Sequence, residues 1–217
     1  MARETPLTQH GSEQMKTVEL FCGTKSFSKV AQALGHETFT VDNDPQHNPS
    51  ICKSVLSLTP EDLPSCDMLW ASPPYEGFSV AVIGRNWNHD GSPKHERAEL
   101  AMKLAMKTVQ LIEEIKPQYW FIENPVGMLR KMSFMQKYHR KTVTYCQYGD
   151  TRMKPTDIWT NMVFWNPKPR CSPGAKCHVS APRGSRTGTQ GLGNAVERSR
   201  IPEKLFQEIF MEVNKGE

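Results

Sequence analysis

The 217-residue sequence contains no long hydrophobic run, and its longest apolar or aromatic stretches are only a few residues, as at 119–122. Because a helix that crosses a bilayer needs about 20 apolar residues in succession, the sequence predicts no membrane-spanning segment. The first sixteen residues also lack the apolar stretch of a secretory signal. We therefore interpret 1–16 as a disordered leader and expect a cytoplasmic protein in which residues 17–217 form a single domain.

Cysteines are too few and too scattered for the disulfide framework of a small secreted protein. The six cysteines are at positions 22, 52, 66, 146, 171 and 177. Cys171 and Cys177, followed by His178, suggest zinc if Cys146 supplies a fourth ligand. Their spacing is not a standard C-x2-C pair, however, so we predict free thiols and no bound metal.

Negative charge is scarce between Trp165 and Lys204, where eight Lys or Arg residues are accompanied by only two Glu residues. This segment therefore carries a net charge of +6, whereas the whole chain carries +4 and the remainder sums to −2. A basic segment on a nearly neutral body is typical of a protein that binds a polyanion. A solvated surface that binds nothing would have the same charge pattern, so the charge alone leaves both interpretations open.

No internal repeat is visible, and the sequence instead alternates short apolar strands with helices, which predicts an α/β fold with a helix-flanked sheet. The expected strands are 17–21, 38–41, 67–71 and 118–122, with antiparallel additions near 141–148 and 157–165, and the expected helices are 26–34, 96–116 and 202–213. Residues 79–95 are expected to form a polar, flexible loop. Residues 166–200 lack periodicity and are expected to form an ordered loop.

The first candidate motif joins the end of one strand, at 21–23, to the acidic residues 42–44 after the next strand. Gly23 lets the backbone approach a ligand, and the helix that follows offers free N–H groups. A carboxylate at the second strand end, Asp42 or Asp44, can accept both hydroxyls of a ribose. The full G-x-G-x-x-G pattern is missing, so a dinucleotide is not favoured, and an ordinary strand–turn–helix remains the alternative.

The second candidate motif, Ser72-Pro73-Pro74-Tyr75, follows the strand 67–71. The two prolines fix a rigid turn, in which the Ser72 side chain and the Pro73 carbonyl can accept the two hydrogens of an aromatic amine. Tyr75 can stack on the face of an unpaired base. Catalysis would then consist largely of aligning an in-line methyl transfer. The alternative is a purely structural proline turn.

The third candidate motif, Glu123-Asn124-Pro125, follows the strand 118–122. Glu123 could hydrogen-bond the edge of a flipped cytosine, or could protonate N3 of the base if its pKa were raised. A capping or ion-paired glutamate is the alternative. In an open α/β sheet, ligands bind beyond the carboxyl ends of the strands, and all three motifs are predicted at such ends.

Together the motifs resemble those of S-adenosylmethionine-dependent DNA methyltransferases, most closely the DNA cytosine-5 methyltransferase family in its compact, phage-like form. Four stretches carry the resemblance: LFCGTKSFSKVAQALGHETFTVDND for the cofactor loop, ASPPYEGFS for the catalytic loop, IENPVG for the segment that holds the cytosine, and QYGDTRMKPTDIWTN for the region that lines the active site and contacts phosphate. They lie in the family's order and span roughly residues 17–165.

The resemblance implies a Rossmann-like methyltransferase fold, with a central, mostly parallel sheet flanked by helices and a short basic, loop-rich C-terminal insertion at 166–200 before a helix at 201–217. It implies S-adenosylmethionine as the cofactor and DNA, duplex or single-stranded, as the partner, and leaves the oligomeric state open. The implied cofactor-binding residues are Phe21, Cys22, Gly23, Thr24, Ser26, Phe27, Asp42 and Asn43, and the implied catalytic residues are Ser72, Pro73, Pro74, Tyr75, Glu123 and Asn124.

Three departures from the family pattern matter. Tyr75 stands where the family has its catalytic cysteine, and a phenol is a poor substitute for the thiolate that must add to carbon 6 of cytosine. Lys25-Ser26 replaces a glycine pair in the cofactor loop. Ser54 stands where an aspartate usually binds the adenine amine. Cys22 and Cys66 are not positioned to replace the missing nucleophile.

Because Ser-Pro-Pro-Tyr matches the amino methyltransferases, we predict cytosine N4 as the methylated atom. Adenine N6 and cytosine C5 are the alternatives within the same class. A catalytically inactive DNA-binding or cofactor-sensing relative is the alternative from another class, and RNA as the substrate also stays open.

The expected nucleic-acid contacts are distributed over three segments. Arg85 and Trp87 are predicted as wedges on a loop that closes over a flipped base. Arg152 and Lys154 are predicted to hold phosphates, as are Arg183 and Arg186 within the basic segment. Since only 166–200 is available for reading sequence, we expect short or relaxed specificity.

Overall fold

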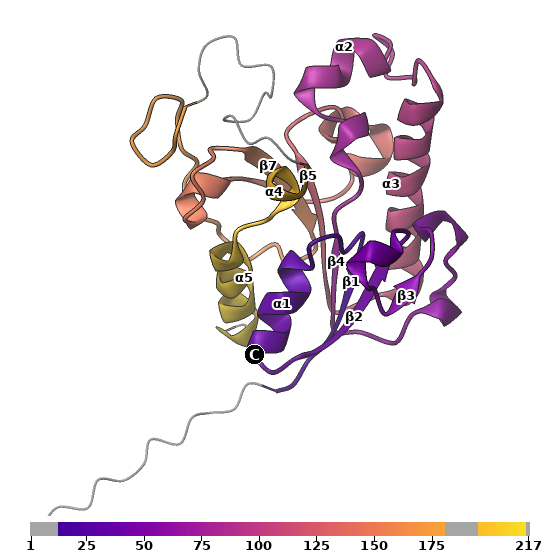
Figure 1. Cartoon of the computed structure of the whole chain (residues 1–217), viewed down its shortest axis with the longest axis vertical. Coiled ribbons are helices and arrows are strands. Elements are labelled where there is room, and N and C mark those ends of the chain that lie inside the picture. Colours follow the sequence, from indigo (N-terminus) through magenta and orange to yellow (C-terminus); the bar gives the residue numbers. More distant parts are fainter. Residues whose placement is uncertain (1–12, 181–194, 216–217) are drawn as a thin grey trace, which may run out of the picture.

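The computed structural model describes residues 13–180 and 195–215, in which a seven-stranded sheet lies between two layers of helices (Figure 1). The strands are β1 (Lys16–Leu20), β2 (Glu37–Asp42), β3 (Ile51–Cys52), β4 (Met68–Ala71), β5 (Tyr119–Pro125), β6 (Arg140–Thr144) and β7 (Pro155–Thr160). Their order across the sheet is β3-β2-β1-β4-β5-β7-β6. The first five in this order pair in parallel, whereas β7 is antiparallel to both β5 and β6.

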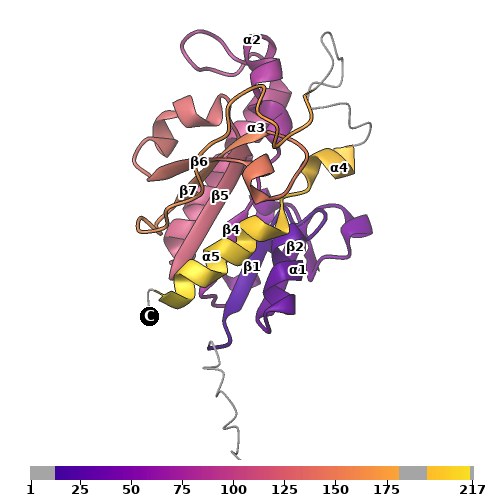
Figure 2. The same ribbon diagram turned by 90° about the vertical axis from the view of Figure 1, so that its left-hand side faces the viewer.

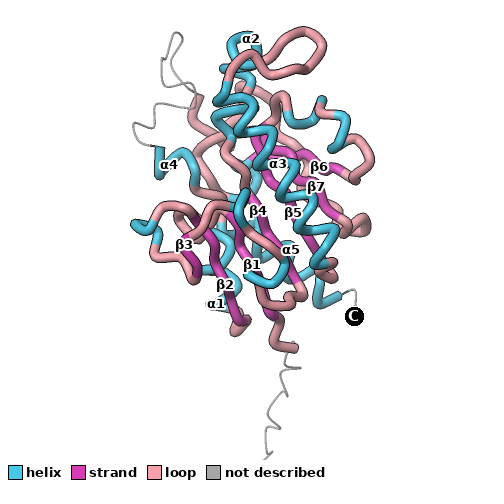
Figure 3. Tube along the Cα trace, turned by 90° about the vertical axis from the view of Figure 1, so that its right-hand side faces the viewer, coloured by secondary structure: helices cyan, strands magenta, loops and turns pink. Residues whose placement is uncertain are grey.

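The helices are α1 (Ser26–Ala33), α2 (Ile83–Asn86), α3 (Glu96–Ile115), α4 (Ala195–Ser199) and α5 (Glu203–Lys215). Helices α1 and α5 cover one face of the sheet, and α5 crosses that face obliquely (Figure 2). The long helix α3 covers the opposite face (Figure 3). The expectation of a mostly parallel sheet flanked by helices is therefore confirmed.

The strand β4 shows how alternation along a strand divides the core into two layers. Met68 and Trp70 belong to the cluster under α1 and α5, whereas Leu69 and Ala71 belong to the cluster under α3. Successive side chains of a strand point to opposite faces, so a strand that is apolar at every position must be covered on both sides. On the first face, the Trp70 ring lies 4.8 Å from the Phe206 ring of α5.

Local sequence explains where α3 begins and ends. Glu96 and Glu99 occupy its first turn, where carboxylates interact favourably with the helix dipole. At the other end, Lys116 adopts a left-handed conformation with φ of 54°, and Pro117 follows it. Proline has no N–H with which to continue the helix and disfavours a helical conformation in the residue before it. The predicted bounds of this helix are therefore correct to within one residue.

The structure differs from the sequence-based expectations at several short elements. Lys16 already belongs to β1 and Met15 is buried, so the folded part begins before residue 17, while 1–12 lie outside the described residues. Residues 83–86 form α2 within the predicted loop 79–95, and α4 lies within the predicted loop 166–200. Such elements are too short to produce a recognisable periodicity.

Among the described residues, we find no helix that combines the length and apolar character needed to cross a membrane.

Candidate active site

The three candidate motifs lie next to one another because the strand order reverses beside β1. From β1 the chain proceeds to β2 on one side, whereas β4 and β5 continue the sheet on the other side. The loops that leave the carboxyl ends of β1 and β4 therefore diverge, and this opening is the usual ligand site of an α/β sheet. The predicted grouping of residues 21–27, 72–75 and 123–125 at one sheet edge is confirmed.

The loop after β1 has an unusual backbone. Phe21, Gly23 and Lys25 all have positive φ, at 58°, 43° and 55°. This conformation is costly for residues other than glycine, and it persists where the surrounding structure over-determines it, commonly at functional sites. Asp42 supplies part of that restraint, because its carboxylate accepts the Gly23 N–H at 2.9 Å and the Asp44 N–H at 3.0 Å.

A cavity of about 110 Å³ opens between the cofactor loop and the catalytic turn. Its lining residues are Phe21, Asp42, Asn43, Lys53, Ser54, Val55, Pro74, Leu100 and Leu104. The lining thus brings together Phe21 and Asp42, which were predicted to bind the cofactor, with Pro74 of the predicted catalytic turn. Pockets that bury a whole ligand of cofactor size typically measure about 300–1,000 Å³. The cavity is therefore smaller than a pocket that buries a whole ligand of this size.

Other predicted cofactor residues are engaged within the protein. Phe27 is fully buried and stacks on Trp70 and Phe210, so its predicted ligand contact is wrong. The helical spacing that places Phe27 on an apolar face makes it a core residue. Cys22 is also buried, and burial raises the pKa of its thiol to about 12. Thr24 and Ser26 hydrogen-bond each other at 2.9 Å.

Glu19, in β1, supports the cofactor loop from below and was missed by the sequence analysis. Its carboxylate accepts the Ser28 hydroxyl at 2.6 Å and the Ser28 N–H at 3.0 Å, so it satisfies groups in the first turn of α1. Burial raises the pKa of Glu19 to about 7, against the lowering effect of these hydrogen bonds. A charged residue in the middle of the strand 17–21 was the one available signal for this role.

Two side chains of the protein donate hydrogen bonds to the turn after β4. The Trp70 indole N–H donates to Ser72 Oγ at 2.9 Å, and the Asn124 side-chain amide donates to the Pro73 carbonyl at 2.9 Å. These are the two acceptors that were predicted to receive an aromatic amine. Each oxygen has one donor and keeps a second lone pair, so both can still accept a hydrogen from a substrate.

Asn124 is itself unusual within the described part of the chain. Its Oδ1 atom is the one buried side-chain nitrogen or oxygen there without a hydrogen-bond partner. An unpaired buried acceptor typically costs about 1–3 kcal/mol, and such atoms in native proteins call for an explanation such as a functional role. The orphan acceptor lies on the residue that fixes the catalytic turn.

Tyr75 follows the turn and is half-buried at the start of a 3₁₀ turn, Tyr75–Gly77. The segment after it is fixed from the side of β5, because the Met128 N–H donates to the Phe78 carbonyl at 2.7 Å. Gly127 makes this approach feasible, since a Cβ atom at that position would lie 2.1 Å from the Phe78 carbonyl oxygen. Pro73 is buried, whereas Pro74 is exposed at the cavity.

The carboxylate of Glu123 lies among polar side chains inside the protein and not in solvent. The Tyr145 hydroxyl donates to Glu123 Oε1 at 2.8 Å, and Glu123 is 5% exposed. The Lys154 ammonium lies 4.8 Å from the centre of the Tyr145 ring and 5.7 Å from the centre of the Tyr75 ring. Burial lowers the pKa of Lys154, and the negative charge of Glu123 opposes this effect. Tyr145 was missed by the sequence analysis.

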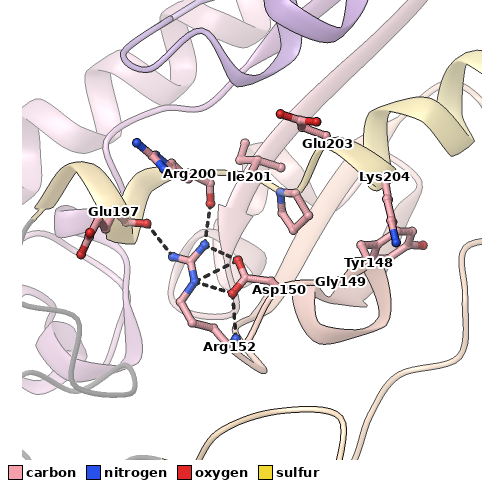
Figure 4. Close-up of a pocket in the computed structure, with 10 residues that line it drawn as sticks. Tyr148, Gly149, Asp150, Arg152, Glu197, Arg200, Ile201, Glu203 and Lys204 are labelled. Atoms are coloured by element: carbon pink, nitrogen blue, oxygen red, sulfur yellow. Dashed lines mark hydrogen bonds and ion pairs between the residues drawn. The ribbon is translucent and has the colours of Figure 1, made fainter.

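Arg152 does not have the predicted role in phosphate binding (Figure 4). Its guanidinium forms an ion pair with Asp150 and donates to the backbone carbonyls of Glu197, Arg198 and Arg200 at 2.9–3.0 Å. Since these contacts engage all five N–H groups of a guanidinium, no donor is left for a phosphate. Arg152 instead ties the 150–154 segment to the segment around α4.

Two further predicted DNA contacts are wrong, and two cannot be evaluated. Trp87 is 3% exposed, stacks on Phe78 and donates its indole N–H to the Gly77 carbonyl at 2.8 Å, so it is a core residue and not a wedge. Lys154 is 9% exposed and faces the tyrosines, not the surface. Arg85 is exposed, in agreement with a surface contact. Arg183 and Arg186 lie outside the described residues.

A larger cavity, of about 470 Å³, lies beside Arg152 and α5 (Figure 4). Its lining residues include Asp150, Glu197, Arg200, Glu203 and Lys204. Because acids and bases alternate around it, this cavity does not have the uniformly positive lining that favours a polyanion. The smaller cavity at the strand ends, which joins the predicted cofactor and catalytic residues, is the better candidate for the reaction site.

The sequence matches a family model and a viral protein, and the fold resembles those of solved methyltransferase structures. The model of the family described as "C-5 cytosine-specific DNA methylase" matches residues 15–144. A protein of Frog virus 3 (isolate Goorha) described as "Probable DNA (cytosine-5)-methyltransferase" is 27% identical over 218 residues, which cover 90% of this chain and 99% of that protein.

Among solved structures, a "putative DNA modification methyltransferase encoded within prophage" from E. coli superposes with a TM-score of 0.51 at 17% identity, covering 68% of this chain and 46% of the other. At this identity the likeness shows the fold alone. The chain spans about half the length of the solved structures that it matches.

These matches correct one sequence-based prediction. The preference for cytosine N4, which rested on Ser-Pro-Pro-Tyr, is not supported, because the matched family model and the viral relative are both described as cytosine-5 enzymes. The broader expectation of a DNA methyltransferase is confirmed at the level of the family. The chain belongs to the C-5 cytosine-specific DNA methylase family, whose model covers more than half of it.

Proposed function

We propose that the protein transfers the methyl group of S-adenosylmethionine to carbon 5 of a cytosine in DNA. The observation that carries the proposal is the cavity in which Phe21 and Asp42 of the cofactor side meet Pro74 of the catalytic turn. A methyl transfer needs its donor and acceptor aligned within a few ångströms, and alignment supplies a large part of the rate. The opening between the β1 and β4 loops is where such alignment is achievable.

On the cofactor side, Asp42 would accept ribose hydroxyls, because each of its oxygens keeps a lone pair beyond the one used by Gly23 or Asp44. Phe21 lines the cavity, and the left-handed backbone at Gly23 follows it in the same loop. Ser54 lines the same cavity, in agreement with its assignment to the adenine side. When bound, S-adenosylmethionine supplies an electrophilic methyl group on a sulfonium centre.

On the base side, Glu123 would hold the cytosine edge. Tyr145 donates to Oε1 of Glu123 and thereby fixes the orientation of the carboxyl group, leaving Oε2 to accept the exocyclic amine. Lys154 balances the carboxylate charge within the same buried cluster. A flipped base read on its hydrogen-bonding edge is the usual substrate arrangement for enzymes that modify bases.

Tyr75 is the residue on which the chemistry depends, because carbon 5 becomes nucleophilic only after addition at carbon 6. In the proposed cycle, the phenol gives its proton to water and its oxygen adds to carbon 6, which moves the electron pair of the C5–C6 double bond to carbon 5. Carbon 5 takes the methyl group with that pair, and the electron pair of the broken carbon–sulfur bond stays on sulfur. Water then takes the proton from carbon 5, the bond from oxygen to carbon 6 breaks, and the resulting phenolate regains a proton. The Lys154 ammonium, 5.7 Å from the centre of the Tyr75 ring, would help to hold that ring in place.

Cys22 and Cys66 do not take over this role, because burial raises the pKa of both thiols to about 12 and so suppresses the reactive thiolate. Since a phenol oxygen is a weaker nucleophile than a thiolate, the proposal implies slow turnover. Cytosine N4 is the second candidate, favoured by Tyr75 as a stacking residue and disfavoured by the match to a cytosine-5 family.

The test is identification of the methylated nucleoside. The full chain is incubated with methyl-labelled S-adenosylmethionine and duplex DNA, single-stranded DNA or RNA, and the product is digested and analysed by mass and retention. We expect 5-methylcytosine from DNA, about tenfold faster formation by Tyr75→Cys, and loss of product in Tyr75→Phe with unchanged cofactor affinity. Tyr138→Phe, a tyrosine paired with Glu113 away from the site, is the matched control.

Each other result contradicts a specific part of the proposal. N4-methylcytosine as the sole product would overturn the carbon-5 assignment while retaining the base. Product on RNA alone would overturn the DNA assignment. Absence of product from both the wild-type protein and Tyr75→Cys, with the cofactor bound, would support an inactive DNA-binding relative.

A further inference from the structure

A second cluster of reactive side chains lies away from the strand ends, beside the turn that follows β6. Cys146 lies in the 3₁₀ turn Tyr145–Tyr148, and Cys171, Cys177 and His178 come from the basic segment. One ligand atom from each residue lies within 4.8 Å of every other. This cluster is not used by the proposed methyl transfer, and the spacing in the sequence led us to predict free thiols there.

Four of the six distances within the cluster, at 3.1–3.7 Å, approach the edges of a tetrahedron. The Sγ atoms of Cys171 and Cys177 are 3.1 Å apart, and those of Cys146 and Cys177 are 3.6 Å apart. His178 Nδ1 lies 3.4 Å from Cys171 Sγ and 3.7 Å from Cys177 Sγ. With Zn–S bonds of about 2.3 Å and Zn–N bonds of about 2.0–2.1 Å, tetrahedral ligands stand about 3.5–3.8 Å apart.

A disulfide is a poorer explanation of the same geometry. Its two sulfurs would be bonded at about 2.05 Å. The shortest sulfur–sulfur distance in the cluster is 3.1 Å, and all six cysteines are free. A disulfide between two members would also leave the third thiol and the imidazole without a role. Three thiols converging on one imidazole nitrogen are instead the ligand set Cys₃His of structural zinc sites.

The backbone around the cluster is organised to hold this arrangement. The Cys171 N–H donates to Thr144 Oγ1 at 2.9 Å, and the Val179 N–H donates to the Thr151 carbonyl at 2.8 Å. The segment is thus attached to the 144–151 region on both sides of its ligands. Burial of apolar side chains contributes little to the stability of this segment, because Cys177 and Val179 are exposed. A segment with so little buried apolar surface needs another source of stability.

We propose that Cys146, Cys171, Cys177 and His178 bind one zinc ion that fixes the basic segment beside the candidate active site. Cys146 is next to Tyr145, which orients Glu123, so the ion would also stabilise the base side of the site. Exposed Lys168, Arg170 and Lys176 would be held in one arrangement around it. Such an arrangement suits contact with phosphates.

The test measures metal directly and does not depend on methyltransferase activity. The full chain is purified under reducing conditions, stripped with a chelator, and titrated with zinc and with cobalt. We expect one zinc ion per chain by elemental analysis and a cobalt spectrum typical of tetrahedral thiolate ligation. We also expect a rise in the midpoint of thermal unfolding when zinc is restored.

Variants distinguish ligation from simple structural damage. Cys177→Ser and His178→Gln change exposed or half-buried residues, so both proteins should fold yet show weaker zinc binding and an altered cobalt spectrum. Cys52→Ser, at an exposed cysteine outside the cluster, should bind zinc as the wild type does. A stripped protein that takes up no zinc, or a mass two hydrogens lower that reveals a disulfide in the reduced preparation, would overturn the proposal.

Discussion

The two halves of the candidate active site are built in different ways. The cofactor half, comprising residues 19–28 and 42–54, relies on backbone geometry, with four residues at positive φ and two carboxylates, Glu19 and Asp42, that each accept two backbone N–H groups. The base half, comprising residues 72–78, 123–127 and 145–154, relies on buried side chains that pair with one another. The first half presents main chain to a ligand, whereas the second positions a few polar groups inside a packed region.

This difference explains why the sequence locates the residues of the cofactor half more readily than the contacts of the base half. A glycine and an acid at strand ends can be recognised locally, because the backbone that they shape lies within a few residues. The side chains of the base half reach across the fold, so their roles depend on partners far away in the sequence. Mutations in the base half should accordingly lower mainly the free energy of unfolding. Mutations of Asp42 in the cofactor half should lower mainly the affinity for S-adenosylmethionine.

The largest effect is expected from Arg152→Met, which removes the buried ion pair with Asp150 and three contacts to carbonyls near α4. Loss of one partner of a buried pair typically costs about 3–5 kcal/mol. We expect the free energy of unfolding in urea to fall by that amount. Arg85→Met, at an exposed arginine, is the control and should change it by less than about 0.5 kcal/mol. Unchanged stability with weakened DNA binding would restore the phosphate role.

A smaller effect, confined to the cofactor half, is expected from Asp42→Ala. The Gly23 and Asp44 N–H groups would lose a charged acceptor, and such hydrogen bonds contribute about 1.5–3 kcal/mol. Affinity for S-adenosylmethionine, measured by calorimetry, should therefore fall about 10- to 100-fold. Asp44→Ala is the matched control, because the Asp44 side chain contacts the Gln46 N–H and His47 within its own turn. An equal loss of affinity for S-adenosylmethionine in both variants would mean that Asp42 has no specific role in binding the cofactor.

The smallest effect concerns Glu19 and is seen in the pH dependence of stability. Burial raises the pKa of this carboxyl from 4.5 to about 7 in the folded state, so the folded protein binds the proton more tightly than the unfolded chain. Its stabilising contribution is therefore complete below pH 4.5 and is lost as the pH rises through about 7.

In Glu19→Gln this dependence should disappear, removing a slope of at most about 1.4 kcal/mol per pH unit. The measurement is urea unfolding of both proteins at several pH values between 4.5 and 8. Glu37→Gln, at an exposed position of β2, should retain the wild-type slope. A slope that persists in Glu19→Gln would show that another group titrates in this range.

Much of the fold follows from the sequence because its signals are local. The strand that ends at Ala71 and the helix that ends before Pro117 are recognisable from apolar runs and breakers. β3 has only two residues, which is too short for any pattern in the sequence to predict it. It is recognised as a strand only because it pairs with β2 in the folded protein. Phe27 and Trp87 illustrate the same limit within the site. Each lies in the correct segment, but its side chain points into the core.

By itself, the sequence determined the order of the longer strands and helices, the strand-end position of the three motifs, and the family. These depend on residues close together in the chain, where alternation, helical spacing and breaking residues act directly. Only the tertiary structure decided which side chains face the site. Arg152 meets carbonyls 45–48 residues away, and Cys177 meets a cysteine 31 residues away. Such contacts form only when distant segments pack together, because burial and pairing are properties of the folded chain.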